Sequence, residues 1–324
     1  MAERDALFAT AGSGLARIRT GPRTTFVLAL VLVAVVTAIL NLDTSVFFLT
    51  PVLLHLARAR RSSELPYLYG AVFMSNAASL FLPGSNLTNL IVLHHERASG
   101  VVFLSRMWAA AIAATVVTIA LLVLVFRREL GEPRPEEDFE PAAPRLGIGV
   151  LAVAAATVLV LALSAPALPV LAVGIAAVLL ARVPWARLQA AIDVRLLAGL
   201  FALAVALGSL GRAWGGPERL LESLGRWQTA AFGALASIGL NNLPAAVLLT
   251  PDPPPHPRAL LLGLNLGPNL AVTGSLSALL WLRVARSLGA RPSARLYSQL
   301  GLLIVPLSLG AAVATLWLVA PGRL

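Results

Sequence analysis

Long apolar stretches alternate with short polar ones along almost the whole chain. The main apolar runs cover 24–40, 101–126, 146–163, 168–182, 190–210 and 296–319. Most of them approach the roughly 20 residues that a helix needs to cross the hydrocarbon core of a bilayer. The pattern predicts an all-α polytopic membrane protein.

Two apolar stretches are interrupted by polar residues in the same way. The first interruption is Asn41-Leu-Asp-Thr-Ser45, followed by Leu49-Thr-Pro51; the second is Gly239-Leu-Asn-Asn-Leu-Pro244, followed by Leu249-Thr-Pro251. The duplication predicts that residues 24–57 and 227–250 each form a re-entrant hairpin with the polar residues at its tip. For 24–57, the alternative is a plain spanning helix over 24–42.

Two further apolar stretches are broken near the middle. Residues 66–93 contain Pro83-Gly-Ser-Asn86, and residues 258–284 contain the matching Asn269-Leu-Ala-Val-Thr-Gly-Ser275. Irregular backbone at membrane depth is tolerated only where it is buried in protein or lines a wet cavity. A hairpin and a broken helix in each half predict an inverted repeat with two re-entrant hairpins and two broken transmembrane helices, as in transporters built from internal repeats.

The predicted elements divide the chain into four parts. Residues 1–23 form an amphipathic surface helix or a flexible tail, 24–126 the first repeat, 127–145 an exposed linker rich in proline and carboxylates, and 146–324 the second repeat. Five crossings lie between the two hairpins, so the hairpins enter from opposite faces of the membrane. Most arginines fall in segments on the same face of the membrane as the N-terminus. This bias predicts a protein of the cell's inner (plasma) membrane, with the N-terminus and the linker inside and the C-terminus outside.

Composition narrows the class of protein further. The chain is 58% hydrophobic and 12% charged, which excludes a water-soluble globule; its net charge of +10 resides in arginines between apolar runs, not on a nucleic-acid-binding face. It has no cysteine, and therefore no thiolate metal site. Paired carboxylates, a Ser-His arrangement and a His-Glu zinc signature are missing from the sequence as well, so we expect no enzyme activity, no metal and no cofactor.

The four polar interruptions are the candidate binding site. A helix that begins at the membrane midplane presents backbone N–H groups and the positive end of its dipole. The residues expected to surround a small oxygen-rich solute or a sodium ion there are Asn41, Asp43, Thr44, Ser45, Ser85, Asn86, Asn241, Asn242, Asn269, Thr273, Gly274 and Ser275. The alternative is that they cap helices and join them, as polar residues in membranes do.

Asp43 is the only carboxylate in these interruptions. Burying a carboxylate in a membrane costs about 2.5–3.5 kcal/mol on insertion scales, so binding a cation or exchanging a proton is the first interpretation. The alternative is a cap on the helix that follows. Asn242, with Pro244 in the same turn, is interpreted as the capped start of the corresponding helix in the second half.

The same motifs resemble those of a known family. Asn241-Asn-Leu-Pro-Ala245, followed by Leu264-Asn-Leu-Gly-Pro-Asn-Leu-Ala-Val-Thr-Gly-Ser-Leu276, is similar to the arsenical-pump membrane proteins, arsenite exporters of the ion transporter superfamily. Asp43-Thr-Ser45 and Pro83-Gly-Ser-Asn86 resemble the matching motifs of the first half, and the resemblance covers about 10–320. It implies an elevator-type transporter whose hairpins and broken helices form the mobile domain. The superfamily also includes sodium/proton antiporters and sodium-coupled dicarboxylate symporters, so the resemblance supports the fold more than the substrate.

Two features depart from that family's pattern. Position 42 is leucine where the family has asparagine, and Asn41 is the residue expected to compensate. The family also has further crossings before the first hairpin, and they help to form its scaffold. Their absence from this sequence leaves three explanations: a misassigned start, a separate subunit, or a degenerate protein.

From these features we expect a secondary transporter that exports arsenite or antimonite, coupled to a gradient of protons or sodium ions. The alternatives are a sodium- or proton-coupled transporter of anions or dicarboxylates, and a truncated membrane subunit without transport activity. The expected partners are the lipid bilayer, the small inorganic solute and the coupling ion; nucleic acid is excluded. Candidate protein partners are a second copy in a homodimer, a scaffold subunit, and a separate ATPase, since the sequence has no GxxxxGK[ST] loop.

Overall fold

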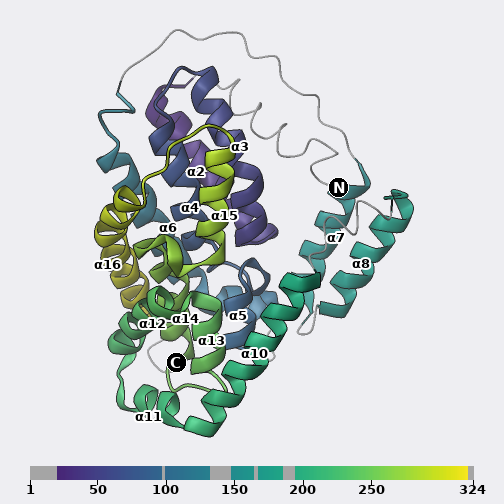
Figure 1. The fold of residues 1–324 in the computed structure, drawn as a ribbon. Coiled ribbons are helices and arrows are strands. Elements are labelled where there is room, and N and C mark those ends of the chain that lie inside the picture. Colours follow the sequence, from purple (N-terminus) through teal and green to yellow (C-terminus); the bar gives the residue numbers. More distant parts are fainter. Residues whose placement is uncertain (1–19, 97–98, 132–146, 164–166, 185–193, 320–324) are drawn as a thin grey trace.

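The fold is described by a computed structural model that covers residues 20–96, 99–131, 147–163, 167–184 and 194–319. All regular secondary structure of these residues is helical. In chain order the α-helices are α2 (Pro22–Ile39), α3 (Leu42–Ala59), α4 (Glu64–Ala78), α5 (Leu87–Val92), α6 (Gly100–Val125), α7 (Ile148–Ala162), α8 (Ala167–Leu180), α10 (Val194–Trp214), α11 (Gly216–Ser223), α12 (Arg226–Leu240), α13 (Asn242–Leu249), α14 (Pro257–Leu266), α15 (Leu276–Ser287) and α16 (Ala294–Val319). Figure 1 shows a tall body of helices, with α7, α8 and α10 forming an arm beside it.

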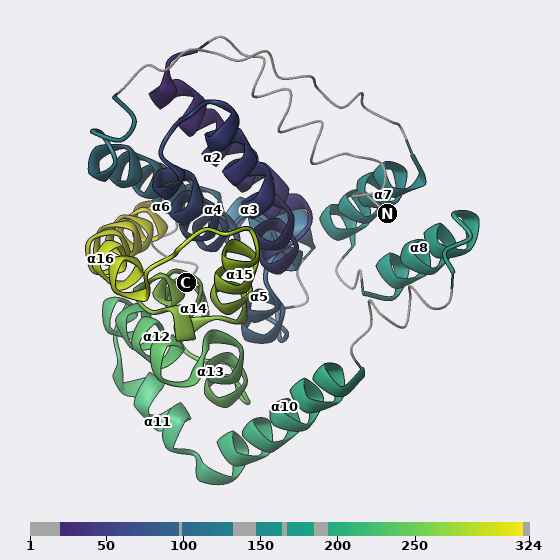
Figure 2. The ribbon, with the colours of Figure 1, turned by 45° about the horizontal axis from the view of Figure 1, so that its top comes forward.

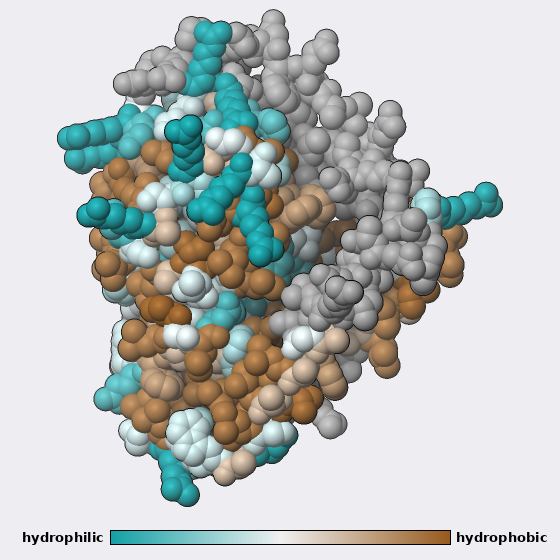
Figure 3. All heavy atoms as spheres, in the orientation of Figure 1, coloured by the Kyte–Doolittle hydropathy of each residue, from teal (hydrophilic) through white to brown (hydrophobic). Residues whose placement is uncertain are grey.

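Three helical segments are long and apolar enough to cross a membrane: Pro22–Ile39, Gly100–Val125 and Ala294–Leu316. The shorter apolar helix α8 turns leucines outward, with Leu168 77% and Leu180 71% exposed. Figure 3 shows a broad hydrophobic zone on one face of the body, with hydrophilic side chains projecting mainly from its upper end. Apolar surface of this extent suits hydrocarbon better than water. These features agree with the predicted all-α membrane protein.

The chain turns back on itself between α2 and α3. Arg60, just past the end of α3, donates a 2.6 Å hydrogen bond to Thr25 Oγ1 in the first turn of α2. Close to the turn, Thr37 Oγ1 donates to Ser45 Oγ at 2.7 Å. The two helices are therefore antiparallel neighbours, as expected of a hairpin. α2 alone is also long and apolar enough to span, as in the alternative interpretation of 24–42.

A second turn of this kind joins α12 and α13 at Asn241. At the end of the pair opposite the turn, which we call its open end, Arg226 at the start of α12 and His256 after α13 line one small cavity. Arg258 of α14 and Leu316 of α16 line the same cavity. α13 has 8 residues against 15 in α12, so the second pair is less even than the first.

The two helix pairs open at opposite ends of the body. At one end, which we name the Arg58 end, Arg58 at the close of α3 bonds Glu64 at 2.7 Å and the carbonyl of Leu288 at 2.9 Å. At the other, the Glu96 end, Glu96 forms a 2.7 Å ion pair with Arg258, beside the open end of α12 and α13. Figure 1 shows α2 and α3 in the upper part of the body and α12 and α13 in the lower part. Both turns therefore lie in the interior, between the two ends.

Helices α4 and α14 both end in irregular backbone. After α4 a 3₁₀ turn, Pro83–Ser85, precedes α5; after α14 two such turns, Gly267–Leu270 and Val272–Gly274, precede α15. The proline in each segment lacks the N–H that a continuing helix needs. At Gly274 an added Cβ would lie 2.7 Å from Pro268 Cα, so the second segment requires glycine there. Both interruptions predicted from the sequence are present.

Aromatic side chains pack α4, α15 and α16 together. The ring centroids of Tyr69 and Trp281 lie 5.4 Å apart, those of Trp281 and Tyr297 5.5 Å, and those of Phe73 and Tyr297 4.9 Å. Tyr297 OH also donates to the carbonyl of Pro268 at 3.0 Å. The cluster therefore holds the irregular segment after α14 against the first half of the chain.

The stretch 211–226, between the apolar run 190–210 and the second predicted hairpin, is largely helical. Gly215, with a φ of 60°, separates the end of α10 from α11. An added Cβ at Gly211 would lie 2.8 Å from the carbonyl of Leu248, so α10 packs closely on α13 and continues as a helix there. Figure 2 shows α10 running along the outside of the body towards α11. The predicted segments 1–23 and 127–145 lie mostly outside the described residues.

Candidate functional site

The two turns and the two irregular segments meet inside the body. We name them the first tip (40–45), the second tip (240–244), the first break (79–86) and the second break (267–275). Ser85 Oγ of the first break donates to the carbonyl of Ala38, beside the first tip, at 3.0 Å. Asn241 Nδ2 of the second tip donates to the carbonyl of Thr273, in the second break, at 3.1 Å. The structure thus brings each tip beside a break.

Buried amide and hydroxyl side chains join the first break to the second half of the chain. Asn76 Nδ2 donates to Asn269 Oδ1 at 2.7 Å. Ser79 Oγ donates to Asn265 Oδ1 at 3.1 Å, and Asn86 Nδ2 donates to the same oxygen. All of these side chains are buried, and polar groups buried without partners are rare in folded proteins. The network therefore holds the first break to α14 and the second break to α4.

The hydrogen bonds divide the predicted site residues into two groups. The first group is buried and bonded to other protein atoms: Ser45, Ser85, Asn86, Asn269 and Ser275. Gly274 belongs with them, because its role is to let the second break pack on itself. We name this group the framework residues.

The second group has surface open to a solute. Asn41, Asp43, Thr44 and Asn241 are partly exposed, and Thr273 is exposed. Asn242 stands between the groups: it is 5% exposed and is the first residue of α13. The open residues come from both tips and from the second break.

Asp43 does not cap α3, so the alternative interpretation of this residue is wrong. Asn41 is the cap, because its Oδ1 accepts the backbone N–H of Thr44 at 2.8 Å. Asp43 lies in the first turn of α3, where its Oδ1 accepts a 2.5 Å hydrogen bond from Ser277 in the first turn of α15. A carboxylate at a helix start is stabilised by the helix dipole. Leu42 is 3% exposed and packs in the core, so this position has no polar role.

The cap of α13 is Asn241 rather than the predicted Asn242. Its backbone φ and ψ are 74° and 147°, a region that glycine occupies far more readily than asparagine. Its side chain holds the turn, since Oδ1 accepts from the N–H of Leu243 at 3.4 Å and Nδ2 donates to the carbonyl of Thr273. The corresponding Asn41 has an extended φ of 177°. The second tip is therefore the strained one.

Three helices of at least 8 residues begin at this site: α3, α13 and α15. Asn41, Asn241 and Ser275 cap them, and each cap accepts one of the first backbone N–H groups. The other first-turn N–H groups and the positive dipole ends favour an anion nearby. The tips and breaks contain no arginine, lysine or histidine, so attraction for an anion comes from the helix starts.

A cavity of about 630 Å³ lies beside the first tip, between the body and the arm. Its walls are Ala38, Ile39, Leu40, Asn41, Gly84, Leu90, Gly149, Ala152, Val153, Ala156, Val160, Ala167, Val170, Val173, Gly174, Ala177 and Val178. The volume suits a small molecule, for which sites span about 300–1,000 Å³. The walls are nevertheless apolar except at Asn41, so we interpret the cavity as space next to the binding site.

Sequence reasoning does not single out Asn265 or Ser277, although both contact predicted residues. A signal for Asn265 exists in the sequence. It precedes Asn269 by about one helical turn in an otherwise apolar run, and amides at that spacing face the same side of a helix. Ser277 follows the cap Ser275 in an ordinary helical turn, and no local pattern marks it.

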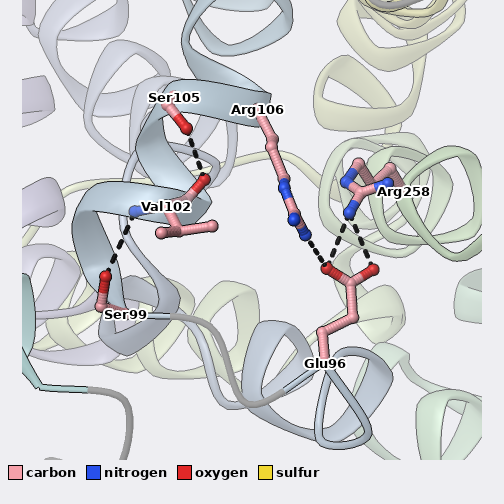
Figure 4. Close-up of polar contacts among 6 residues, drawn as sticks. All are labelled: Glu96, Ser99, Val102, Ser105, Arg106 and Arg258. Carbon is pink, nitrogen blue, oxygen red and sulfur yellow. Dashed lines mark hydrogen bonds and ion pairs between the residues drawn. The ribbon is translucent and has the colours of Figure 1, made fainter. Parts of the chain in front are cut away.

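An ion cluster stabilises the Glu96 end, away from the tips. Figure 4 shows the guanidinium groups of Arg106 and Arg258 converging on the carboxylate of Glu96, with Nη–O distances of 2.7 Å and of 2.8 and 2.7 Å. The side chain of Arg258 is 7% exposed, so its charge depends on this carboxylate. Nearby, burial and the charge of Arg226 lower the pKa of His256. The cluster holds the start of α14 to the loop that follows α5.

The citrate transporter family (CitMHS) matches the sequence over residues 1–252. This range is more than half of the 324 residues, and it includes the first tip, the first break and the second tip. No curated protein matches the chain. The described helices include three apolar membrane-span candidates, as a transporter of this family requires. The chain therefore belongs to the citrate transporter (CitMHS) family, and it is a multi-pass secondary transporter of the citrate or anion type rather than an enzyme.

Proposed function

We propose that the protein carries a small carboxylate anion, such as the citrate that its family is named for, through a site between the two tips and the two breaks. The observation that supports this proposal is that three helices begin beside the breaks. Asp43 at the start of α3 accepts from Ser277 at the start of α15, and Asn241 at the start of α13 donates to the carbonyl of Thr273. Each start acts as about half a positive charge, so together they offset about one and a half negative charges. A di- or tricarboxylate therefore needs a further cation to bind.

Asp43 is our candidate for the site of that cation. Its carboxylate would repel an anionic solute, unless a proton or a sodium ion binds with the solute. The side chain is partly exposed, and Ser277 fixes one of its oxygens at 2.5 Å. Carboxylate and hydroxyl oxygens are suitable ligands for a hard cation. Binding of the anion and of the cation then depend on each other, which is the basis of coupled transport.

The open residues are assigned to contact with the solute. Asn41, Thr44, Asn241 and Thr273 offer amide N–H and hydroxyl groups, which donate to carboxylate oxygens. Asn242 contributes the start of α13. The framework residues keep these groups in place and have their own hydrogen bonds inside the protein.

The order of the helices favours an inverted repeat and an elevator-type movement. A helix pair, a broken helix and a long helix occur as α2 to α6 and again as α12 to α16. The two pairs open at opposite ends, as a repeat inverted across the membrane demands. In this mechanism the tips and breaks move as one body against the arm of α7, α8 and α10, and the 630 Å³ cavity lies along that boundary.

The arginines favour an orientation with the Arg58 end in the cytoplasm. The described arginines at that end are Arg23, Arg58, Arg60, Arg61, Arg127, Arg128, Arg283, Arg286, Arg291 and Arg295. Fewer described arginines lie at the Glu96 end, among them Arg106, Arg226 and Arg258. Because cytoplasmic segments carry the excess of basic residues, α2 begins inside and α16 ends outside the plasma membrane in this proposal.

Arsenite export is the second candidate function. The motifs around Asn241 and Asn265 resemble those of arsenite exporters, and the open side chains other than Asp43 are neutral. Arsenous acid is neutral at pH 7 and presents hydroxyl groups, which amides and hydroxyls of the site can bind. Under this alternative the helix starts bind no net charge.

The two candidates are separated by flux measurements on the purified protein in lipid vesicles. We expect labelled citrate to enter when a proton or sodium gradient is imposed, and Thr44→Val to raise the KM for citrate. Thr50→Val is the matched control in the same helix, because the Thr50 hydroxyl donates to the carbonyl of Val46 instead of facing the site. Citrate flux no higher than in empty vesicles refutes the carboxylate proposal. Arsenite flux in the same vesicles would then support export of arsenite, and absence of both would indicate a subunit without transport activity.

A further inference from the structure

We propose that Asn265 is a positioning residue for this site: from the second half of the chain it holds the first break, and through that break the first tip. Asn265 lies in α14 and is 0% exposed. The inference deepens the proposed function and rests on it for the place where the solute binds. It gives the protein a residue that sets the geometry of the site without touching the solute.

The amide of Asn265 uses its whole hydrogen-bonding capacity. Oδ1 accepts from Asn86 Nδ2 and, at 3.1 Å, from Ser79 Oγ, whose proton is shared with a carbonyl of its own helix. Nδ2 donates to Asn89 Oδ1 at 2.8 Å and to the carbonyl of Leu261 at 3.0 Å. A primary amide accepts two hydrogen bonds and donates two. Because donors surround the oxygen and acceptors surround the nitrogen, a single orientation of the amide satisfies all four.

Asn86 carries the effect of Asn265 to the first tip. Its Oδ1 accepts the N–H of Thr88 at 3.1 Å and the hydroxyl of Thr88 at 2.5 Å, so Asn86 caps α5. The adjoining Ser85 donates to the carbonyl of Ala38, where α2 enters the first tip. Asn265 therefore fixes Asn86 directly, and the neighbour of Asn86 fixes the backbone that carries the open residues of the tip.

A second buried amide link between the halves, at Asn269, provides a contrast. Asn269 accepts from Asn76 at 2.7 Å and donates to the carbonyl of Phe73 at 3.3 Å. Both partners lie in α4, before the first break begins. Loss of this link removes buried hydrogen bonds of the same kind but leaves Asn86 and Ser85 with their own partners. Asn269→Leu is therefore the matched control for Asn265→Leu.

Mobility of the first turn of α5 tests the positioning role without any solute. The sequence has no cysteine, so a single cysteine can carry a nitroxide spin label without competing thiols. Leu87 is the first residue of α5 and is 54% exposed, which makes Leu87→Cys a suitable place for the label. In the full-length protein in vesicles, we expect Asn265→Leu to increase the mobility of the label and Asn269→Leu to leave it near that of the parent. Unchanged mobility in Asn265→Leu, or equal increases in both variants, overturns the proposal.

A gentler variant covers the case in which Asn265→Leu does not fold. Asn265→Asp keeps the oxygen that Asn86 and Ser79 donate to, and replaces the donor nitrogen on the other side. Because Asn89 in α5 loses its donor, we expect a mobility between that of the parent and that of an Asn86→Ala variant if Asn265 acts mainly through Asn86. Mobility as high as in an Asn86→Ala variant overturns the proposal.

Transport measurements test the consequence for the site. We expect Asn265→Leu to raise the KM for citrate about tenfold, equal to about 1.4 kcal/mol, while the maximum rate stays within about twofold. Ser85→Ala should also raise the KM, and the double variant should be no worse than Asn265→Leu alone, because the two residues act in series. If the KM increases of the two single variants multiply in the double variant, Asn265 and Ser85 act independently, which contradicts the proposal.

The flux and spin-label measurements distinguish failure of the proposed function from failure of the positioning role. A wild-type protein that moves no citrate refutes the proposed function, yet the spin label still decides whether Asn265 holds the first break. A wild-type protein that moves citrate, with a label unaffected by Asn265→Leu, leaves the function standing and refutes the positioning role.

Discussion

Replacing Asn241 by glycine should stabilise the second tip while weakening transport. The backbone of Asn241, with φ 74° and ψ 147°, lies in a region that costs a residue other than glycine about 1–3 kcal/mol. Glycine removes most of that cost. It loses the hydrogen bond to the carbonyl of Thr273, worth about 1 kcal/mol, and only a few tenths of a kcal/mol of the cap. The free energy of unfolding should therefore change by between about zero and about 2 kcal/mol in favour of the folded state.

Alanine at the same position should have the opposite effect. Asn241→Ala keeps the strain, and it loses about 1 kcal/mol of capping and about 1 kcal/mol of hydrogen bonding. The corresponding residue Asn41 is the matched control, because its φ of 177° is extended and glycine relieves no strain there. At Asn41 the glycine and alanine variants should differ by less than about 1 kcal/mol; at Asn241 they should differ by about 2 kcal/mol or more.

The assay is thermal unfolding of the four variants in one detergent, followed by citrate flux in vesicles. Asn241→Gly should unfold at or above the temperature of the wild type. It should transport less, because it lacks the amide that we propose contacts the solute. Asn241→Ala that is as stable as Asn241→Gly would refute the strain argument. So would an equal glycine–alanine difference at Asn41.

Three further predictions concern charge and the start of α13. Asp43→Asn keeps the shape of the side chain but not its charge, so citrate flux should become independent of an imposed proton or sodium gradient; flux that still follows the gradient would show that Asp43 is structural. Asn242→Ala should abolish transport at normal expression. Asn242 is not the cap of α13, so its loss should spare the helix and remove only its proposed part in the binding site; wild-type flux would contradict that part. Glu96→Gln should destabilise the protein by about 3 kcal/mol in thermal unfolding, because it removes the counter-charge of Arg258, whose side chain is 7% exposed. The matched control is Glu64→Gln, because the side chain of its partner Arg58 is 39% exposed and loss of this ion pair should cost at most about 1 kcal/mol. Equal destabilisation by the two variants would contradict the argument from burial.

The sequence by itself determined where the helices stop and turn. The predicted interruptions contain the observed helix starts at Asn41 and Asn241, although the sequence interpretation placed the caps at Asp43 and Asn242. Pro83 and Pro268 each lie where a helix breaks. These features are predictable because a side-chain cap and a missing backbone N–H act on the nearest few residues. The apolar runs likewise sufficed to predict a helical membrane protein, because the length and composition of a run are local properties of the sequence.

The tertiary structure alone decided which polar groups meet. Asp43 resembled a cap from its neighbours, yet it accepts a hydrogen bond from Ser277 on a distant helix. Asn265 was one polar residue in an apolar run, yet from α14 it holds the first break and the start of α5. Ser45 had the same local setting as the open residues of the first tip but is buried against Thr37. Burial and hydrogen-bond partners depend on how helices from opposite ends of the sequence pack, and no window of neighbouring residues contains that information.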